Sequence, residues 1–276
     1  MTTAPRVLVS ADGSGDNPPD RRERAERGSR VLVTWHEDLR GFDGARAGLA
    51  ERGLEAVAAP LTRTIPAPED ALDALAGAIH DHEGIGLVAF TSPRALTVLG
   101  DVDYAGAQAR GVRIAAVGPG TRRVLQELGI TPDITGRGGA DDLLPRIPAP
   151  DSDRPVAVLP NSALAAPTLE RGLREKGWDV HRVPVYTTTA VDAAPDGLRE
   201  DWLAGHFAGA IVRSGSAATA LIDLLGRAPD QTWTVALGPS TAADAERVGL
   251  RIDAVAEEPT MRGAGSALVN RLKGSA

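Results

Sequence analysis

The chain contains an internal repeat: a short segment near its middle recurs 120 residues later. Residues 116–121 read Ala-Val-Gly-Pro-Gly-Thr, and residues 236–241 read Ala-Leu-Gly-Pro-Ser-Thr. Each segment runs on through a helix-like stretch to a glycine flanked by apolar residues, at residues 128–130 and 248–250. Because self-similarity of this kind marks a duplicated structural unit, the sequence predicts two similar domains.

Two further pairs of segments support the duplication. Residues 91–95 (Thr-Ser-Pro-Arg-Ala) precede the first repeat, and residues 213–217 (Arg-Ser-Gly-Ser-Ala) precede the second. Residues 53–61 and 177–185 both place a glycine seven residues before a proline, at the end of a predicted strand. Proline is tolerated on edge strands, so these two strands could pair with each other as a bridge between the domains.

From residue 30 onward, short apolar runs alternate with helical patterns. Short apolar runs are typical of strands covered on both faces, and regular alternation with helices predicts α/β domains with parallel sheets and right-handed crossovers. The predicted strands are residues 31–33, 54–61, 87–90, 114–117, 156–159, 180–186, 210–212 and 235–237. The predicted helices are residues 45–51, 72–82, 94–99, 122–128, 168–176, 217–225, 242–248 and 265–272.

Composition excludes several classes of protein. The 276 residues suffice for two domains, and the net charge of −7 with 3% aromatic residues argues against a nucleic-acid partner. The chain has no run of about 18 apolar residues, so no membrane span is predicted. Cysteine is absent, which excludes disulfides and zinc–thiolate sites and fits a cytoplasmic location. Residues 1–29 are rich in Gly, Pro, Asp and Arg, so we interpret them as a disordered tail.

Familiar catalytic and cofactor motifs are missing. The chain has no phosphate-binding Gly-x-x-x-x-Gly-Lys loop and no Gly-x-Ser-x-Gly turn, and residues 118–120 lack the third glycine of a dinucleotide fingerprint. His80 and His82 lie two apart on a predicted helix and therefore face different directions, which makes a poor metal site. We interpret the histidines as surface residues and predict no metal.

The repeated turns are the remaining candidates for a site. Each lies between a strand and a helix, at the edge of a parallel sheet where ligands bind and where helix amides attract carboxylates or phosphates. The alternative is that Ser92, Thr121, Ser214 and Thr241 only cap their helices. Four such turns on duplicated domains favour a carboxylate-rich ligand between the domains. The candidate binding residues are Thr91, Ser92, Pro93, Gly118, Thr121, Ser214, Gly215, Ser216, Gly238 and Thr241.

Tyr186 is one of only two tyrosines in the chain. It follows Pro184 at the end of a predicted strand, at the predicted junction between the domains. A phenol there can donate a proton or a hydrogen bond to a ligand, although a strand tyrosine more often simply packs.

Taken together, these segments resemble the uroporphyrinogen-III synthase family. The resemblance runs from about residue 31 to residue 272, and the order and spacing of its short motifs are more specific than any one of them. The motifs are residues 90–95 (Phe-Thr-Ser-Pro-Arg-Ala), 117–121, 184–187 (Pro-Val-Tyr-Thr), 214–217, 238–241 and 258–260 (Glu-Pro-Thr).

The resemblance implies two similar parallel-sheet α/β domains joined by a two-stranded β-ladder. One domain would comprise residues 30–62 and 187–276, so that the first strand packs with the C-terminal half, and the other residues 63–186. In that arrangement the two glycine-to-proline segments are the ladder strands.

The resemblance also implies a reaction. Enzymes of this family convert hydroxymethylbilane, an octacarboxylate, to uroporphyrinogen III in the biosynthesis of tetrapyrroles such as heme and cobalamin. They are carbon–oxygen lyases, which release water and invert the terminal ring D without a metal or cofactor. Tyr186 matches the family's candidate acid. We further expect a monomer that can receive its substrate from hydroxymethylbilane synthase.

Three positions depart from the family pattern. Trp35 stands where many members have arginine, Asn161 lies where a basic or glycine-containing turn is common, and Arg213 replaces a usual threonine or phenylalanine. A moved arginine would change how carboxylates are held. The competing hypothesis is a non-catalytic ligand-binding or regulatory protein on the same two-domain scaffold.

Overall fold

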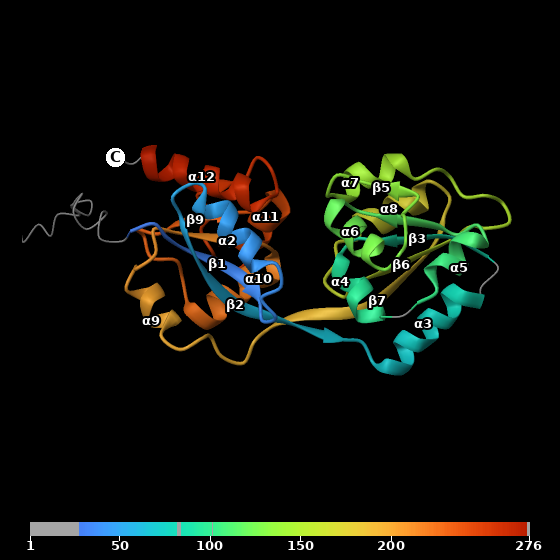
Figure 1. Ribbon diagram of the computed structural model, residues 1–276, viewed down its shortest axis with the longest axis horizontal. Coiled ribbons are helices and arrows are strands. Elements are labelled where there is room, and N and C mark those ends of the chain that lie inside the picture. Colours follow the sequence, from blue (N-terminus) through green and yellow to red (C-terminus); the bar gives the residue numbers. More distant parts are fainter. Residues whose placement is uncertain (1–27, 82–83, 101, 275–276) are drawn as a thin grey trace, which may run out of the picture.

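The computed structural model describes residues 28–81, 84–100 and 102–274, and all but the end of the predicted 1–29 tail lies outside them. Figure 1 shows two lobes side by side, connected by the long strands β2 (Glu55–Pro66) and β7 (Asp179–Ala190). In the described part of the chain, no helix is both long and apolar enough to cross a membrane.

All ten strands of the described residues join in one continuous hydrogen-bonded order, β10-β9-β8-β1-β2-β7-β6-β3-β4-β5. Every neighbouring pair is parallel except β2 and β7, which are antiparallel. β1 pairs with β8, as the resemblance implies for the first strand and the C-terminal half. The other strands are β1 (Arg30–His36), β3 (Ile85–Phe90), β4 (Arg113–Ala116), β5 (Ile134–Thr135), β6 (Val156–Ser162), β8 (Gly209–Val212), β9 (Trp233–Ala236) and β10 (Ala254–Val255).

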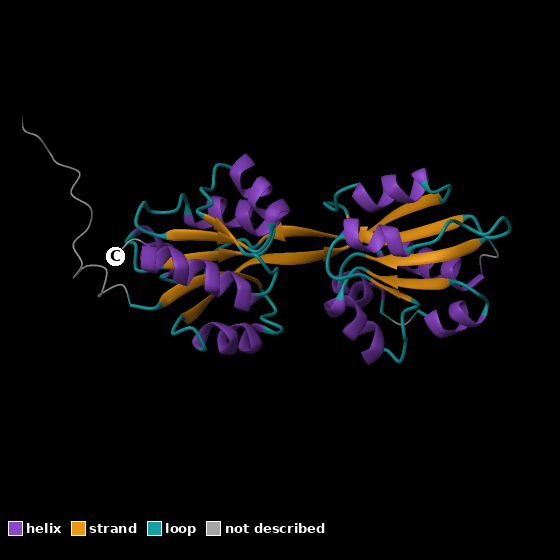
Figure 2. Ribbon diagram, turned by 90° about the horizontal axis from the view of Figure 1, so that it is seen from above, coloured by secondary structure: helices purple, strands orange, loops and turns teal. Residues whose placement is uncertain are grey.

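Helices cover both faces of the sheet in each lobe, as Figure 2 shows. The first lobe contains β1, β8, β9 and β10 with the helices α2 (Phe42–Ala50), α9 (Leu198–Leu203), α10 (Gly215–Leu225), α11 (Pro239–Arg247) and α12 (Met261–Gly274). The second lobe contains β3, β4, β5 and β6 with α3 (Glu69–Asp81), α4 (Pro93–Leu99), α5 (Tyr104–Ala109), α6 (Pro119–Glu127), α7 (Ala140–Leu143) and α8 (Thr168–Glu175).

The ladder between the lobes lies beyond the segments that the sequence suggested. β2 and β7 do not end at their prolines; Pro60 pairs with Trp35 and Pro184 with Asn161, in parallel register with β1 and β6. Each register shifts directly after the proline, as expected where a residue without an N–H breaks the pairing. The antiparallel ladder then joins residues 62–66 to residues 186–190. The expectation that these two strands pair as the bridge is confirmed, but the paired residues lie after residues 53–61 and 177–185 and not within them.

The antiparallel ladder determines the relative strand directions of the two lobes. β2 is parallel to the other strands of the first lobe, and β7 is parallel to those of the second. Because β2 and β7 meet antiparallel, the carboxyl ends of both sheets must point toward each other. In parallel sheets ligands bind at these ends. The fold therefore directs both candidate binding edges into the space between the lobes.

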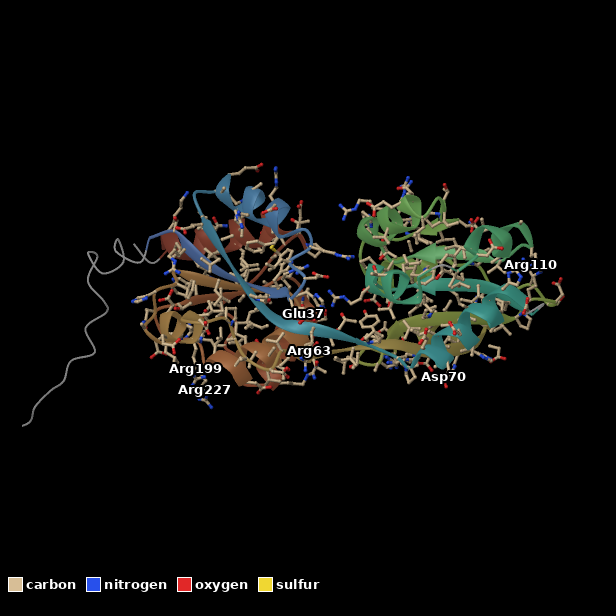
Figure 3. All side chains as sticks on the ribbon, turned by 60° about the horizontal axis from the view of Figure 1, so that its bottom comes forward. Glu37, Arg63, Asp70, Arg110, Arg199 and Arg227 are labelled. Carbon is tan, nitrogen blue, oxygen red and sulfur yellow. The ribbon has the colours of Figure 1, made fainter. Side chains whose placement is uncertain are left out.

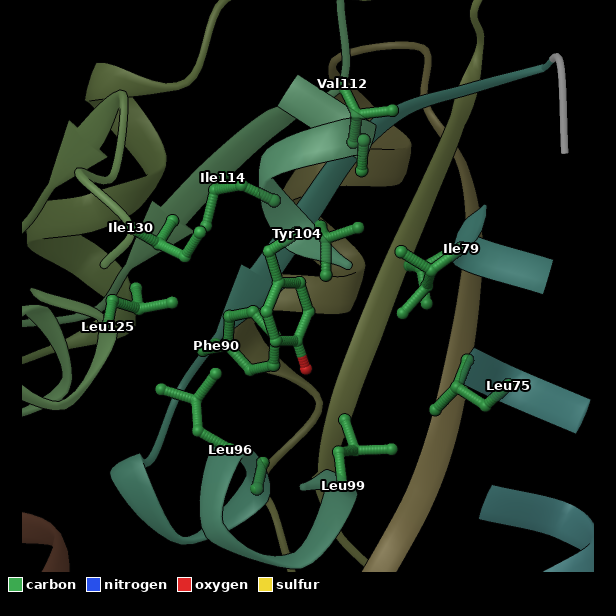
Figure 4. Packing of buried hydrophobic residues seen from close by; sticks show 14 of the residues in the cluster. Leu75, Ile79, Phe90, Leu96, Leu99, Tyr104, Val112, Ile114, Leu125 and Ile130 are labelled. Carbon is green, nitrogen blue, oxygen red and sulfur yellow. The ribbon is translucent and has the colours of Figure 1, made fainter. Parts of the chain in front are cut away.

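The buried side chains form four clusters, two in each lobe, on opposite faces of each sheet. Figure 4 shows the cluster of the second lobe that surrounds Phe90 and Tyr104, whose rings meet edge to face at 5.5 Å. Edge-to-face contacts of this kind add to the stability gained from burial. Since each cluster draws on one lobe, each lobe has its own hydrophobic core.

Most predicted elements are present, and the short ones were missed. α5 has six residues and includes Gly106, which weakens any helical pattern. Asp103 compensates by capping it, with Oδ1 accepting from the Gly106 amide at 2.7 Å. α9 is equally short, and β5 and β10 have only two residues each. Elements of this length carry too few residues for a periodic signal.

Candidate functional site

A cleft of about 650 Å³ lies between the lobes, where the carboxyl ends of the sheets converge. The first lobe contributes the end of β1, the loop after it and the start of α10. The second lobe contributes residues of α4 and α6, and the ladder contributes Thr62, Thr64 and Thr188. Both lobes and the strands that join them therefore border one cavity.

Four of the predicted binding residues line this cleft, namely Ser92, Pro93, Ser214 and Ser216. Ser92 Oγ accepts from the Arg94 amide at 3.2 Å, and Ser214 Oγ accepts from the Ala217 amide at 3.2 Å. The two serines are therefore N-caps of α4 and α10, as the alternative interpretation held. They nevertheless border the cavity, so capping and ligand binding do not exclude each other.

Thr121 and Thr241 do not cap their helices. Both are buried, at 2% and 7% exposure, and the N-cap positions of α6 and α11 are Gly118 and Gly238. The capping interpretation was wrong for the two threonines because a glycine without a side chain precedes each Pro-x-Thr turn. Amides in the first turn of a helix have no carbonyl partner within the helix. A glycine cap leaves them to a ligand or to water.

The two glycines differ in their surroundings, which yields a prediction about stability. A Cβ added to Gly118 would lie 2.9 Å from Gly138 Cα, whereas one added to Gly238 would meet nothing within 4 Å. Both residues are extended, so backbone strain does not separate them. Gly118→Ala is expected to lower the free energy of unfolding by about 1–3 kcal/mol, and Gly238→Ala to change it little. Urea unfolding tests this, and equal midpoints for the two variants would contradict it.

The remaining predicted residues do not border the cleft: Thr91, Gly118, Thr121, Gly215, Gly238, Thr241 and Tyr186. Tyr186 is 7% exposed and packs into the core cluster of the second lobe. It lies where β7 passes from β6 to the ladder, paired with Ser162 and Pro66. Side chains two apart on a strand share a face, about 7 Å apart. Tyr186 is therefore one strand repeat from Thr188, which does line the cleft.

The cleft contains charged side chains to which the sequence analysis gave no binding role. They are Arg40, Arg94, Arg123, Arg213, Asp38 and Glu127. Arg40 lies 3.9 Å from Asp38 and Arg123 lies 3.5 Å from Glu127, so both carboxylates have an arginine. Within the described chain, Arg94 and Arg213 have no carboxylate within 4 Å. The sequence shows the motif that contains Arg94 and the unusual residue Arg213, but it does not show that both arginines line the same cleft.

Arg213 is held against the cleft wall by an aromatic ring. Its guanidinium carbon lies 3.6 Å from the centre of the Trp35 ring, and its buried Nε has no hydrogen-bond partner among the described residues. Trp35 is fixed in turn by a 3.1 Å bond from its Nε1 to the carbonyl of Arg40 and by edge contact with Phe42. Burial, and then the charge of Arg94, lower the pKa of Arg213 to about 10, although Asp38 opposes this. The guanidinium therefore stays charged at neutral pH.

The loop after β1 is anchored to the ladder through His36. Its Nε2 lies 3.0 Å from Thr64 Oγ1, and its Nδ1 lies 3.2 Å from Asp38 Oδ1. Burial alone would raise the pKa of Asp38, but bonds from the Arg40 amide and His36, with the charge of Arg94, lower it. Leu39 has a φ of 53°, a left-handed conformation that costs a branched residue energy. The loop is thus held in one particular conformation at the cleft.

Comparisons with known proteins agree with this architecture. The chain is 28% identical over 250 residues to the chloroplastic uroporphyrinogen-III synthase of Oryza sativa subsp. japonica, covering 86% of this chain and 76% of that protein. A mutant uroporphyrinogen III synthase from the extremely thermophilic bacterium Thermus thermophilus matches 89% of this chain and all of its own, with a TM-score of 0.53 and 23% identity. The uroporphyrinogen-III synthetase of Helicobacter pylori matches 90% of this chain and all of its own, with a TM-score of 0.56 and 14% identity.

The two structural matches show a shared fold, because their identities are low. The family is shown by the sequence itself. The model of the family described as uroporphyrinogen-III synthase HemD matches residues 43–264, which include the ladder, every described strand except β1, and the cleft residues from Thr62 onward. The chain therefore belongs to the uroporphyrinogen-III synthase family.

Proposed function

We propose that this protein is a uroporphyrinogen-III synthase, a hydro-lyase of tetrapyrrole biosynthesis. It cyclises hydroxymethylbilane to uroporphyrinogen III, with loss of water and inversion of ring D. The observation that carries the proposal is a family match spanning both lobes, together with a cleft at which the carboxyl ends of both sheets meet.

The cleft suits a substrate with many carboxylates. Helices α4 and α10, capped by Ser92 and Ser214, begin at the cleft, and α6, which begins after Gly118, lines it; Gly238 precedes the corresponding helix α11. Helix N-termini favour anions through their free amides and dipoles. In this proposal Thr91, Ser92, Pro93, Gly118, Thr121, Ser214, Gly215, Ser216, Gly238 and Thr241 bind or position the substrate. Local groups thus attract an octacarboxylate to a protein whose net charge is −7.

Tyr186 is the proposed general acid. Loss of hydroxide from the substrate requires a proton donor, and the cationic intermediate that follows requires a shielded site that holds the chain ends together. Tyr186 lies on the ladder strand β7, one repeat from the cleft-lining Thr188. A substrate that spans both lobes would pass along this strand and bring its reacting end to the phenol.

The separate cores support a division into two domains. We place residues 30–62 and 187–276 in one domain and residues 63–186 in the other, joined by the two-stranded ladder. Supporting this division, β2 and β7 pair only over residues 62–66 and 186–190, and each core cluster lies within one lobe. Two connecting strands allow the domains to move relative to each other. A cytoplasmic location, a monomeric state and hand-over from hydroxymethylbilane synthase remain predictions.

One assay separates the enzyme from a ligand-binding or regulatory protein on the same scaffold. Hydroxymethylbilane cyclises spontaneously to the type I isomer, so the purified protein is mixed with it and the ratio of isomers is measured. An enzyme is expected to give predominantly type III product, in proportion to protein concentration. Type I product alone, at the rate of a protein-free control, would reject the enzyme and favour the regulatory hypothesis.

A further inference from the structure

The cleft has two more cations than its own carboxylates neutralise. Of its four arginines, Arg40 and Arg123 lie near Asp38 and Glu127, and Arg94 and Arg213 are left over. Arg94 belongs to α4 in the second lobe, and Arg213 immediately precedes Ser214, the N-cap of α10 in the first lobe. The unneutralised charge therefore comes from both sides of the cavity.

Arg213 is partly buried in the cleft wall, but the described part of its own lobe provides no carboxylate within 4 Å that neutralises its charge. A partly buried guanidinium costs desolvation energy, which carboxylates or hydrogen bonds normally offset. Here the Trp35 ring supports one face of the guanidinium, and the buried Nε has no hydrogen-bond partner in the described part of the chain. A planar guanidinium held by stacking has its hydrogen-bond donors oriented in advance, which favours bidentate binding of a carboxylate.

Arg94 and Arg213 line the same cleft, and the charge of Arg94, after burial, lowers the pKa of Arg213. The positive charge of Arg94 disfavours the protonated form of Arg213 and favours the ionised form of Asp38. Two like charges that border one cleft from different lobes repel unless an anion lies between them. A ligand carboxylate placed there would satisfy both arginines and draw the lobes together.

We propose that Arg213 and Arg94 together bind one carboxylate side chain of the substrate and bridge the two lobes across the cleft. This inference rests on the proposed function, because the octacarboxylate substrate supplies the anion. The pair is a binding and positioning device, and Tyr186 remains the proton donor. Closing the lobes around one carboxylate would fix the substrate relative to the ladder.

The test is the steady-state kinetics of the variants Arg213→Gln and Arg94→Gln with hydroxymethylbilane. Each variant is expected to raise KM by about tenfold to a hundredfold, the effect of losing a hydrogen bond between charged groups. The double variant should lose less than the product of the two single effects, because both arginines hold the same group. Arg213→Lys should recover only part of the loss, since lysine lacks the planar fork.

Matched controls remove the same charge elsewhere. Figure 3 shows Arg110 at the far end of the second lobe and Arg227 on the outer side of the first. Arg110→Gln and Arg227→Gln are expected to leave KM within about twofold, because exposed charges beyond a Debye length are screened. A comparable rise in KM in these controls would show that net charge, and not this pair, governs binding.

A second measurement protects the conclusion if a variant folds poorly. Uroporphyrin III, a non-reacting octacarboxylate, should raise the Tm of the parent protein more than that of either variant. Arg94 does not stack on Trp35, so its replacement leaves that contact intact. If Arg213→Gln folds poorly, Arg94→Gln alone can decide the question. Suppose the parent makes type III product and both variants keep its KM and its Tm shift. The proposed binding of one carboxylate by Arg94 and Arg213 is then wrong, and the proposed function stands. If the parent makes only type I product, the proposed function fails first.

Discussion

Replacing Tyr186 with phenylalanine is expected to reduce kcat about a hundredfold or more, because a positioned general acid contributes about 10²- to 10⁴-fold to the rate. The ring that packs into the second-lobe cluster is retained, so Tm should stay close to that of the parent. KM should change little, since the phenol acts on the departing hydroxyl and not on the carboxylates. Initial rates of type III formation, measured at saturating hydroxymethylbilane, provide the test.

The chain offers a matched control in its second tyrosine. Tyr104 belongs to the same core cluster, where Figure 4 shows it, and is 1% exposed. Among the described residues, its buried hydroxyl has no hydrogen-bond partner. Burial raises the pKa of Tyr104, so its hydroxyl stays neutral. Tyr104→Phe is expected to leave kcat unchanged and to keep or raise stability, because it removes an unsatisfied buried group.

Comparison of the two tyrosine variants gives a clear outcome. A large loss in Tyr186→Phe with none in Tyr104→Phe would support the proton donor. Near-parental turnover in Tyr186→Phe would remove Tyr186 from the mechanism and leave a substrate carboxylate as the alternative acid. Equal losses in both variants would indicate damage to the shared core of the second lobe.

Trp202→Ala is expected to lower the free energy of unfolding by about 3–5 kcal/mol, the usual cost of deleting a buried tryptophan. Trp202 is fully buried in a first-lobe cluster, and its Nε1 donates to the carbonyls of Gly226 and Arg227 at 3.3 and 3.1 Å. Its loss leaves a cavity and two carbonyls without a partner. A fall in Tm of about 10 °C should follow.

The same variant tests whether the lobes are separate domains. Because each lobe has its own core and only two strands connect them, the second lobe should retain its parental stability. Scanning calorimetry of Trp202→Ala is therefore expected to resolve two transitions, with the first-lobe transition moved down. A single cooperative transition displaced as a whole would show that the lobes unfold as one unit.

Leu203→Ala is the control for this experiment. Leu203 adjoins Trp202 in α9 but is 53% exposed, so its truncation should change the free energy of unfolding by less than about 0.5 kcal/mol. A similar fall in Tm for Leu203→Ala would indicate that fraying of α9, and not loss of the buried indole, explains the effect.

Much of the fold was predictable from local patterns. Short apolar runs and glycine-terminated helices such as residues 122–128 identify parallel strands and their crossovers, because both depend on neighbouring residues. The repeated segments correctly pointed to turns at strand ends, and Ser92 and Ser214 cap helices as their residue types predict. Register was less accessible, since Pro60 and Pro184 interrupt the parallel pairing without ending their strands.

The candidate site was only partly predictable. Ser92 and Ser214 line the cleft, whereas Thr121 and Thr241 are buried in their own helices. The residue type and the spacing are the same in both repeats, so nothing local shows which turns open to the cavity. That depends on how α4, α6, α10 and α11 pack around the ladder.

The sequence by itself determined the class of fold, the duplication and the family, because these rest on periodicity and on motifs read along the chain. Only the tertiary structure decided that the carboxyl ends of the two sheets oppose each other, since this follows from the antiparallel pairing of β2 with β7. It also decided that Arg94 and Arg213 share a cleft whose two carboxylates, Asp38 and Glu127, lie nearest to Arg40 and Arg123. Charge neutralisation depends on distances in space, and residues far apart in the chain carry no local signal of it.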